Sequence, residues 1–283
     1  MRPDDLKKML EQYGLRPIHG RGQNFLLDDS VVVKMTEAAG VGPGSRILEI
    51  GPGPGILTAA LLAAGAHVTA VEIDSRFFRF LQKRFGGQPG LDLIEGDVLD
   101  MPNQDIAERL AGDWQVVSNL PYGITSAVLE KFLFHEPRPK SLTLMLQREV
   151  ADRILAKPRD MSSLAVACQS LGEPRRVVNV PRGSFFPPPE VDSAVIHIRL
   201  KNEAERREFF QGVPESDFFR IVRQAFVQKR KQIKNSLRSL PGTPEQQEKT
   251  LQQAKIPPSA RPEELTPEQW LALAMAIIGM TAP

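Results

Sequence analysis

Residues 47–55 read Ile-Leu-Glu-Ile-Gly-Pro-Gly-Pro-Gly, an apolar run that leads straight into a glycine-rich turn. An apolar segment with helical spacing follows at residues 56–64. Glycine adopts positive φ without strain and lets the backbone approach a ligand closely. We therefore predict a strand, a ligand-binding turn and a helix, the first part of an α/β sheet. A turn that only connects the strand to its helix is the alternative.

The same alternation of a short apolar run with a longer helix-like segment continues to about residue 147. Parallel strands joined by right-handed helical crossovers form a sheet with helices on both faces. Such a sheet binds its ligands at the carboxyl ends of the strands. The expected strands are residues 46–50, 67–72, 91–95, 115–118 and 142–146, and the expected helices are residues 56–64, 75–84, 105–110 and 126–134.

The pattern changes after residue 158. Two further strands are expected at residues 173–180 and 191–200, and the Phe-Phe-Pro-Pro-Pro stretch between them cannot be a central strand because prolines lack the hydrogen-bond donor. From residue 201 onward the pattern indicates helices only. We predict an α/β domain at residues 1–200 and a small all-helical domain at residues 201–283. The expected helices of the second domain are residues 218–240, 244–254 and 266–279.

The composition is that of an ordinary globular protein. Among 283 residues, 41% are hydrophobic and 25% charged, which excludes a disordered or collagen-like chain, and the net charge of +2 excludes a histone-like one. The single cysteine cannot form an internal disulfide, and the four histidines lack metal-ligand spacing, so we expect no metal. No apolar stretch has the length of a membrane span, and the first ten residues lack the apolar core of a secretory signal. We expect a cytoplasmic protein.

Acidic residues stand at the expected ends of the second and third strands. Glu72 and Ile73 end the second strand, and Asp97 follows the third. Because the carboxyl ends of parallel strands meet at one edge of the sheet, these residues would lie beside Gly51 and Gly53. Carboxylates accept hydrogen bonds from ribose hydroxyls and from an adenine amine. We predict a cofactor that carries both groups.

A nicotinamide oxidoreductase is the alternative for the same residues. The dinucleotide fingerprint also places a glycine-rich turn about 20 residues before an acid that holds the ribose, here Glu72. The spacing Gly-x-Gly-x-Gly, with Pro54 in place of a free turn residue, argues against that class. No Lys-Ser or Lys-Thr pair follows the turn, which excludes P-loop ATPases.

The fourth strand ends in Asn119, Leu120, Pro121 and Tyr122. Oδ1 of Asn119 and the carbonyl of Leu120 can accept both hydrogens of an adenine amine and direct its lone pair toward an electrophilic methyl group. Pro121 fixes φ and shapes the turn, and Tyr122 can stack on an extracted base for roughly 1–3 kcal/mol. We predict these four residues as catalytic for methylation of an adenine amine. A proline turn with an asparagine cap is the alternative.

These motifs together resemble the small-subunit ribosomal RNA adenine dimethyltransferases, within the class I S-adenosylmethionine-dependent methyltransferases. The resemblance implies a Rossmann-like sheet and S-adenosylmethionine as the cofactor. The motifs occur in the family's order over residues 15–240. They are residues 22–26 (Gly-Gln-Asn-Phe-Leu), 49–55 (Glu-Ile-Gly-Pro-Gly-Pro-Gly), 71–74 (Val-Glu-Ile-Asp), 96–97 (Gly-Asp), 119–122 (Asn-Leu-Pro-Tyr), 185–193 (Phe-Phe-Pro-Pro-Pro-Glu-Val-Asp-Ser), 225–226 (Ala-Phe), 229–231 (Lys-Arg-Lys) and 235–237 (Asn-Ser-Leu).

The resemblance also implies roles for the cofactor-binding residues. Gly51 would lie at the amino-acid end of the cofactor, Glu72 on its ribose and Asp97 near its adenine amine. Asn119 would lie between the cofactor and the target base.

The same resemblance places Asn24 and Leu26 across the cofactor. One departure is visible, because this chain has Met161 and Ser162 where the family usually shows Tyr-Gly. We predict that Phe185, which precedes Phe186 and three prolines, faces the site and forms an aromatic wall for the target adenine opposite Tyr122. Packing of that segment on the edge of the sheet is the alternative.

Residues 218–240 carry seven basic residues and no acid, on an apolar pattern of helical spacing. A basic helix face without acids favours contact with phosphates. We predict that RNA binds to Arg223, Lys229, Arg230, Lys231 and Lys234.

The activity implied by the resemblance is the transfer of two methyl groups to N6 of each of two adjacent adenosines. These lie in a hairpin near the 3′ end of small-subunit (16S) ribosomal RNA, so the expected partner of a monomeric enzyme is the immature 30S subunit. One alternative is a large-subunit RNA dimethyltransferase of the antibiotic-resistance type. The other is an RNA-binding assembly factor that keeps the fold without turnover.

Overall fold

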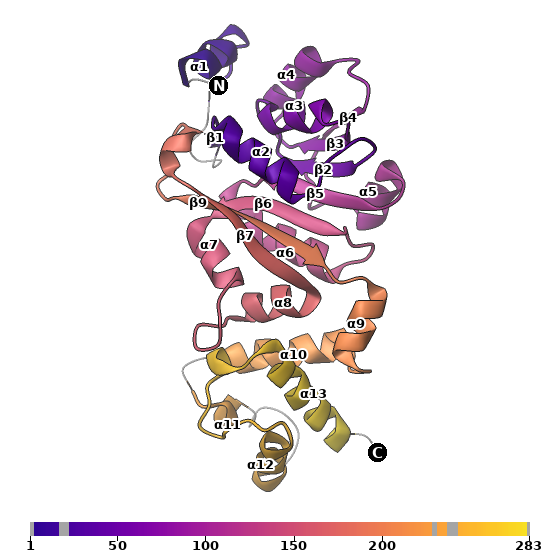
Figure 1. The fold of residues 1–283 in the computed structure, drawn as a ribbon, viewed down its shortest axis with the longest axis vertical. Coiled ribbons are helices and arrows are strands. Elements are labelled where there is room, and N and C mark those ends of the chain that lie inside the picture. The colour runs from indigo at the N-terminus through magenta and orange to yellow at the C-terminus, as the bar shows by residue number, and fades with distance from the viewer. Residues whose placement is uncertain (1–2, 17–22, 228–230, 237–242, 282–283) are drawn as a thin grey trace. The chain divides into compact units, whose positions relative to one another are not determined.

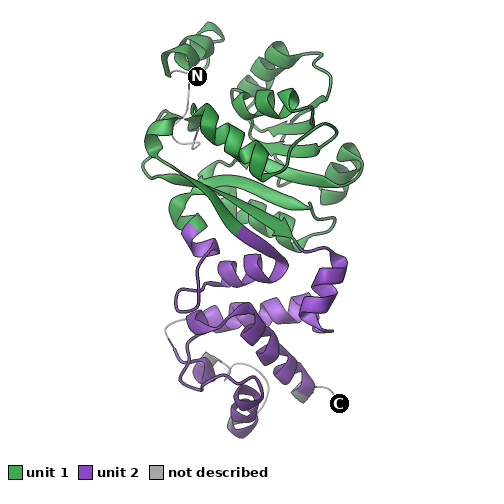
Figure 2. Ribbon diagram, in the orientation of Figure 1, with its two compact units in different colours: residues 1–151, 175–200 green, residues 152–174, 201–283 purple. Residues whose placement is uncertain are grey.

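The computed structural model describes residues 3–16, 23–227, 231–236 and 243–281 (Figure 1). Contacts divide the chain into two compact units (Figure 2). The first unit comprises Met1–Ala151 and Arg175–Leu200, and the second comprises Asp152–Pro174 and Lys201–Pro283. Residues 152–174, which the sequence pattern placed in the first domain, thus belong by their contacts to the second unit. Their helix, α8 (Ser163–Leu171), contacts two helices from the C-terminal part of the chain.

A seven-stranded sheet has the order β4-β3-β2-β5-β6-β9-β7 (Figure 1). Strands β2 to β6 pair in parallel, as predicted, and β9 runs antiparallel to β6. The order reverses between β2 and β5, and such a switch point is where open α/β sheets bind ligands. The strands are β2 (Arg46–Ile50), β3 (His67–Glu72), β4 (Leu91–Glu95), β5 (Trp114–Asn119), β6 (Ser141–Gln147), β7 (Gly172–Val180) and β9 (Ser193–Leu200).

Both faces of the sheet are buried. Ile47 and Val117 face a core that includes apolar residues of two helices, and the alternate residues Leu48 and Val116 are equally inaccessible. This burial on both sides explains why the strands are nearly continuous apolar runs. The helices of this unit are α1 (Pro3–Gln12), α2 (Asp29–Ala38), α3 (Ile56–Ala63), α4 (Ser75–Phe85), α5 (Asn103–Leu110), α6 (Thr125–Phe134) and α7 (Arg148–Ile154), of which the last crosses into the second unit.

A second, two-stranded sheet joins distant segments of the chain. In this sheet β1 (Phe25–Leu26) pairs antiparallel with β8 (Phe185–Phe186), so that Phe25 lies opposite Phe186 and Leu26 opposite Phe185. Strands of two residues have no readable periodicity, so the sequence pattern does not indicate this sheet.

In the described residues of the second unit, the regular elements are helices apart from the first residues of β7. The predicted single helix over residues 218–240 is wrong, because α10 ends at Val227 and α11 begins at Ile233, with Lys231 outside both. Ile233 is fully buried and its N–H donates to the carbonyl of Ala260, so the chain turns inward after the basic run. Besides α8, its helices are α9 (Glu203–Phe210), α10 (Glu215–Val227), α11 (Ile233–Ser236), α12 (Pro244–Gln253) and α13 (Pro267–Thr281).

Across the described parts of the chain, no helix combines the length and the apolar character that crossing a membrane requires.

Two adjacent valines on α2 test the packing of this core. Val32 is 4% exposed and belongs to the core, whereas Val33 is 51% exposed. We expect Val32→Ala to lower the free energy of unfolding of the first unit by about 2 kcal/mol, because it removes buried methyl groups and leaves a cavity. Val33→Ala should change it by less than about 0.5 kcal/mol. Urea titrations of both variants provide the measurement, and equal losses would contradict this placement of α2.

Candidate active site

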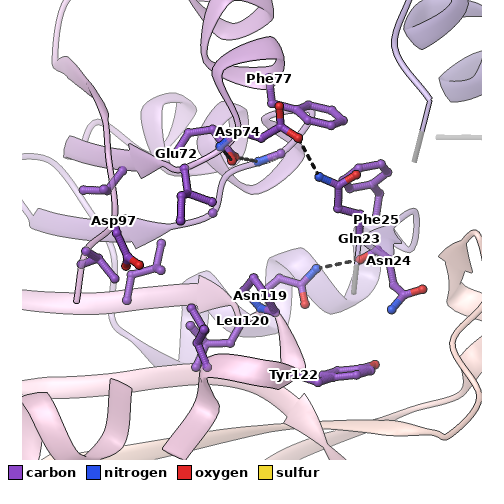
Figure 3. A pocket seen from close by; sticks show the side chains of 18 of the residues that line it. Gln23, Asn24, Phe25, Glu72, Asp74, Phe77, Asp97, Asn119, Leu120 and Tyr122 are labelled. Atoms are coloured by element: carbon purple, nitrogen blue, oxygen red, sulfur yellow. Dashed lines mark hydrogen bonds between the residues drawn. The ribbon is translucent and has the colours of Figure 1, made fainter. Parts of the chain in front are cut away.

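A pocket of about 420 Å³ opens at the carboxyl ends of β2, β3, β4 and β5 (Figure 3). Residues from five of the predicted motifs line it, although they are far apart in the chain. Predicted site residues in the lining are Asn24, Gly51, Gly53, Glu72, Ile73, Asp97, Asn119, Leu120, Pro121 and Tyr122. The remaining lining residues are Gln23, Phe25, Ile50, Val71, Asp74, Phe77, Gly96, Val98 and Ile124.

The glycine-rich turn forms the floor of the pocket, with positive φ at Gly51, Gly53 and Gly55. A Cβ on Gly53 would lie 2.9 Å from the ring of Phe25, and a Cβ on Gly55 would lie 2.5 Å from the ring of Phe85. Both the backbone conformation and the space therefore require glycine. The turn is closely packed against Phe25 and Phe85, and Gly51 and Gly53 line the pocket.

Glu72 holds this turn against the end of β3. Its Oε2 accepts a hydrogen bond of 3.0 Å from the N–H of Gly53, and its Oε1 accepts one of 2.9 Å from the N–H of Asp74. The side chain is 5% exposed, and burial raises the pKa of its carboxyl group. Each oxygen keeps a second lone pair with which a ligand hydroxyl could bond.

Asp74 caps α4, with its side chain accepting a hydrogen bond from the N–H of Arg76. The Arg76 guanidinium also bonds to this carboxylate and holds its pKa well below the usual range. Nε2 of Gln23 donates to the same group at 3.2 Å, which connects the segment before β1 to the pocket (Figure 3).

The pocket has an aromatic wall that the sequence analysis did not predict. Phe25 and Phe77 line it with their ring centroids 5.2 Å apart. Phe77 also belongs to a core with Leu6 and Leu10 of α1. A phenylalanine at helical spacing is indistinguishable from an ordinary core residue in a sequence, so no signal marked Phe77 as part of the site.

A mixed apolar and acidic surface lies at the ends of β3 and β4. Ile73 is 63% exposed, which is unusual for a large aliphatic side chain. Asp97 accepts a hydrogen bond of 2.9 Å from the N–H of Leu99 through Oδ1. An aliphatic surface beside a carboxylate suits a planar base that carries an amine.

Asn119 at the end of β5 is oriented by the segment that precedes β1. Its Nδ2 donates to the backbone carbonyl of Asn24 at 3.3 Å, and its oxygen lies on the side of Tyr122 (Figure 3). The N–H of Leu120 donates to the carbonyl of Met145 at 3.1 Å, which fixes the backbone of the motif on β6. The amide oxygen of Asn119 is therefore available to a group in the pocket.

Tyr122 begins a short 3₁₀ turn, η2 (Tyr122–Ile124), at the rim of the pocket. Its hydroxyl lies 2.6 Å from Oγ of Ser193, and burial raises the pKa of the phenol.

Two predicted site residues lie outside the pocket lining. Leu26 lines a smaller adjoining cavity of about 30 Å³ instead. Phe185 is 4% exposed and packs in the core with Val180 and Val195, because its pairing with Leu26 turns the side chain inward. The prediction that Phe185 forms an aromatic wall of the site is therefore wrong, and the alternative, packing of this residue in the core, is what the structure shows.

The predicted RNA-binding residues lie in the second unit. Arg223 on α10 is exposed, as are Lys231 and Lys234, whereas Lys229 and Arg230 lie outside the described residues. Helix α10 buries its opposite face and begins with Glu215 and Asp217, so acidic residues precede the basic run closely.

The departure from the family pattern at residues 161–162 has a structural role. Oγ of Ser162 accepts from the N–H of Ala165 at 3.1 Å and caps α8, and Met161 is buried.

Glu49 is a second buried acid, one residue before the end of β2. It is 2% exposed and accepts a hydrogen bond of 2.7 Å from Oγ1 of Thr58. Burial raises the pKa of this carboxyl group to about 8, with a smaller contribution from the charge of Glu72. In the described residues, no three His, Cys, Asp or Glu side chains are grouped as a metal site requires.

The sheet order, the glycine-rich turn and the acid at the end of β3 define a class I methyltransferase fold. Among solved structures, a 23S rRNA methyltransferase, ErmE, is similar with a TM-score of 0.71 and 29% identity, covering 90% of this chain and 100% of that one. A dimethyladenosine transferase from Plasmodium falciparum is similar with a TM-score of 0.73 and 25% identity, covering 88% and 95%.

Sequence comparison defines the family. The profile of the ribosomal RNA adenine dimethylase family matches residues 19–278, and the chain belongs to this family. Relatives named ribosomal RNA small subunit methyltransferase A include one from Dehalococcoides mccartyi, 38% identical over 96% of this chain and 92% of its own length. Another, from Caulobacter vibrioides, is 41% identical over 91% and 96%.

The raised pKa of Glu49 predicts a pH dependence of stability. Between pH 4.5 and about 8 the folded state retains a proton that the unfolded state has lost, so the free energy of unfolding falls as pH rises through this window. Glu49→Gln keeps an acceptor for Thr58 but cannot ionise. We expect the variant to exceed the wild type in stability at pH 8, by on the order of 5 kcal/mol at most, and to match it near pH 4.

Urea unfolding across this pH range measures the effect. Glu95→Gln, at an exposed position on β4, is the matched control and should leave the slope of stability against pH unchanged. An unaltered slope in Glu49→Gln would show that another group titrates in this window.

Proposed function

We propose that this protein transfers methyl groups from S-adenosylmethionine to N6 of two adjacent adenosines near the 3′ end of small-subunit ribosomal RNA, two to each. The observation that carries the proposal is the oriented amide of Asn119 beside Leu120 and Tyr122, at the rim of a pocket with acids on two strand ends. Family membership and relatives named as small-subunit methyltransferases support it.

The pocket suits S-adenosylmethionine, which supplies an electrophilic methyl group when bound. The ring of Phe25 packs against Gly53 and Pro121 packs against Gly51, and the hydrogen bond from Gly53 to Glu72 fixes the turn, whose backbone would face the amino-acid end of the cofactor. The free lone pairs of Glu72 match two ribose hydroxyls. Ile73 would contact one face of the adenine, and Asp97 would accept from its amine.

The residues of the fourth strand end would bind and orient the target amine. An adenine amine is a weak nucleophile because its lone pair is delocalised into the ring. Oδ1 of Asn119 and the carbonyl of Leu120 would accept its two hydrogens, which favours a pyramidal nitrogen with its lone pair toward the methyl group. Tyr122 would stack on the base and compensate part of the cost of extracting it.

Alignment and electrostatic contacts to the polarised amine supply most of the acceleration in this scheme. The methylated nitrogen is far more acidic than the amine and loses its proton to water. No strong base is required near Asn119, which agrees with a rim made of an amide, a backbone carbonyl and a phenol.

Binding of the RNA is assigned to the second unit. Arg223, Lys231 and Lys234 are exposed, and α10 packs through its other face. Phosphate contacts by such cations provide affinity without reading the base sequence. The immature small subunit as the substrate, and a monomeric enzyme, remain predictions.

A large-subunit RNA methyltransferase is the second candidate, because a 23S rRNA methyltransferase shares the fold over 90% of this chain. The small-subunit relatives favour the first candidate, since they reach 38–41% identity against 29% for that structure.

Mapping of methylated adenines tests both candidates. Purified protein, labelled S-adenosylmethionine and immature small subunits should give dimethyladenosine at two adjacent positions near the 3′ end, detected by primer extension. Asn119→Ala should lower the rate by at least about a thousandfold, because it removes an acceptor of the reacting amine, while RNA affinity stays within about twofold.

Labelling of large-subunit RNA alone would replace the first candidate with the second. Binding without transfer to either RNA would indicate an assembly factor, and turnover of Asn119→Ala near the wild-type rate would remove Asn119 from the mechanism.

Reversal of charge at Lys229, Arg230 and Lys231 tests the RNA contact. We expect weaker RNA binding and a smaller slope of log affinity against log salt, because fewer counterions are released. Lys157→Glu combined with Lys249→Glu and Lys255→Glu, at three exposed positions of the same unit, changes the net charge by the same amount and is the control. Equal effects of the two sets would show that only net charge matters.

A further inference from the structure

The ring of Tyr122 is held by a residue far along the chain. Its hydroxyl and Oγ of Ser193 are 2.6 Å apart, a close O–H···O hydrogen bond. Tyr122 lines the pocket, whereas Ser193 is fully buried at the start of β9. The hydrogen bond therefore connects the side chain of Tyr122, at the pocket, to a buried residue of the sheet.

Ser193 is itself immobilised by its surroundings. It pairs with Gln147 in the antiparallel ladder between β6 and β9. The preceding residue, Asp192, accepts hydrogen bonds from the N–H of Arg148 through its carbonyl and from the N–H of Arg182 through Oδ1, at 3.0 and 3.1 Å. The backbone of Ser193, and with it the Cβ that carries the hydroxyl, is thus held by the sheet and by the contacts of the residue before it.

The backbone of Tyr122 does not determine the orientation of its ring. Pro121 restricts the backbone ahead of Tyr122, and the N–H of Thr125 donates to the carbonyl of Tyr122. Neither constraint fixes the two side-chain torsions of Tyr122. The hydroxyl of Tyr122 lies on the side of the ring that is remote from Leu120 (Figure 3). It is therefore placed to anchor the ring, whose face remains available to the pocket.

We propose that Ser193 is a positioning residue for methyl transfer, whose hydroxyl holds the ring of Tyr122 in the orientation on which the target adenine stacks. This inference rests on the proposed function. It gives the segment 185–193 a role in the site through its last residue, while Phe185 packs in the core. A base held at the wrong tilt would present its amine poorly to Asn119 and Leu120, even though RNA binding elsewhere is intact.

A double-mutant cycle tests the inference. Ser193→Ala and Tyr122→Phe each remove the same hydrogen bond and keep the ring. Each should lower kcat about tenfold with the KM for RNA changed less than about twofold, because the bond serves orientation. The double variant should be no slower than either single one, since one interaction cannot be lost twice.

Ser141→Ala is the matched control for the loss of a buried serine. It removes a hydrogen bond of 2.9 Å to Gln115 at the other end of β6, far along the strand from Gln147, and should leave kcat unchanged. Urea unfolding of every variant, with a cooperative transition in each, shows that all of them are folded.

A spectroscopic measurement reads the contact without turnover. The chain has two tyrosines, so Tyr13→Phe leaves Tyr122 as the sole one. With ring-labelled tyrosine, Ser193→Ala should shift the Tyr122 resonances and speed its ring flips, and Ser141→Ala should do neither. This arm is informative even if the wild type methylates no RNA, a result that would contradict the proposed function instead.

Three results would each overturn the inference. These are a kcat of Ser193→Ala within about twofold of the wild type, additive losses in the double variant, and unchanged resonances of Tyr122.

Discussion

The carboxylate of Glu72 joins three parts of the site that would otherwise be independent. One oxygen accepts from Gly53 in the glycine-rich turn, and the other accepts from Asp74 at the start of α4. In this turn the N–H groups of Gly51 and Gly55 donate to the carbonyls of Val71 and Pro52, whereas the N–H of Gly53 donates to Glu72. Burial of the acid, which raises its pKa, also strengthens each of these bonds.

Asn119 and Tyr122, the residues proposed to hold the target base, are oriented by neutral hydrogen bonds from distant segments. Asn24 orients the amide of Asn119, and Ser193 holds the hydroxyl of Tyr122. Neutral contacts of this kind specify direction without creating a strong charge beside the amine.

Predictions from periodicity were accurate where the structure depends on local pattern. Strands β2 to β6 and the helices between them were predicted to within a few residues, because buried parallel strands are apolar runs and their helices have their own period. The helix predicted over residues 218–240 was wrong, since a basic run without apolar residues gives no information about where the chain turns. The antiparallel direction of β9 and the pairing of β1 with β8 also came only from the structure.

The amino-acid sequence by itself determined the type of sheet, the edge at which the pocket opens, and the motifs that mark the family, because these depend on residue types at short spacing. Tertiary structure decided how those residues meet. Phe185 turned into the core, Phe77 joined the pocket, and Ser193 reached Tyr122 across 71 positions. The physical reason is that such contacts depend on strand register and side-chain direction across the sheet, which no short stretch of sequence encodes.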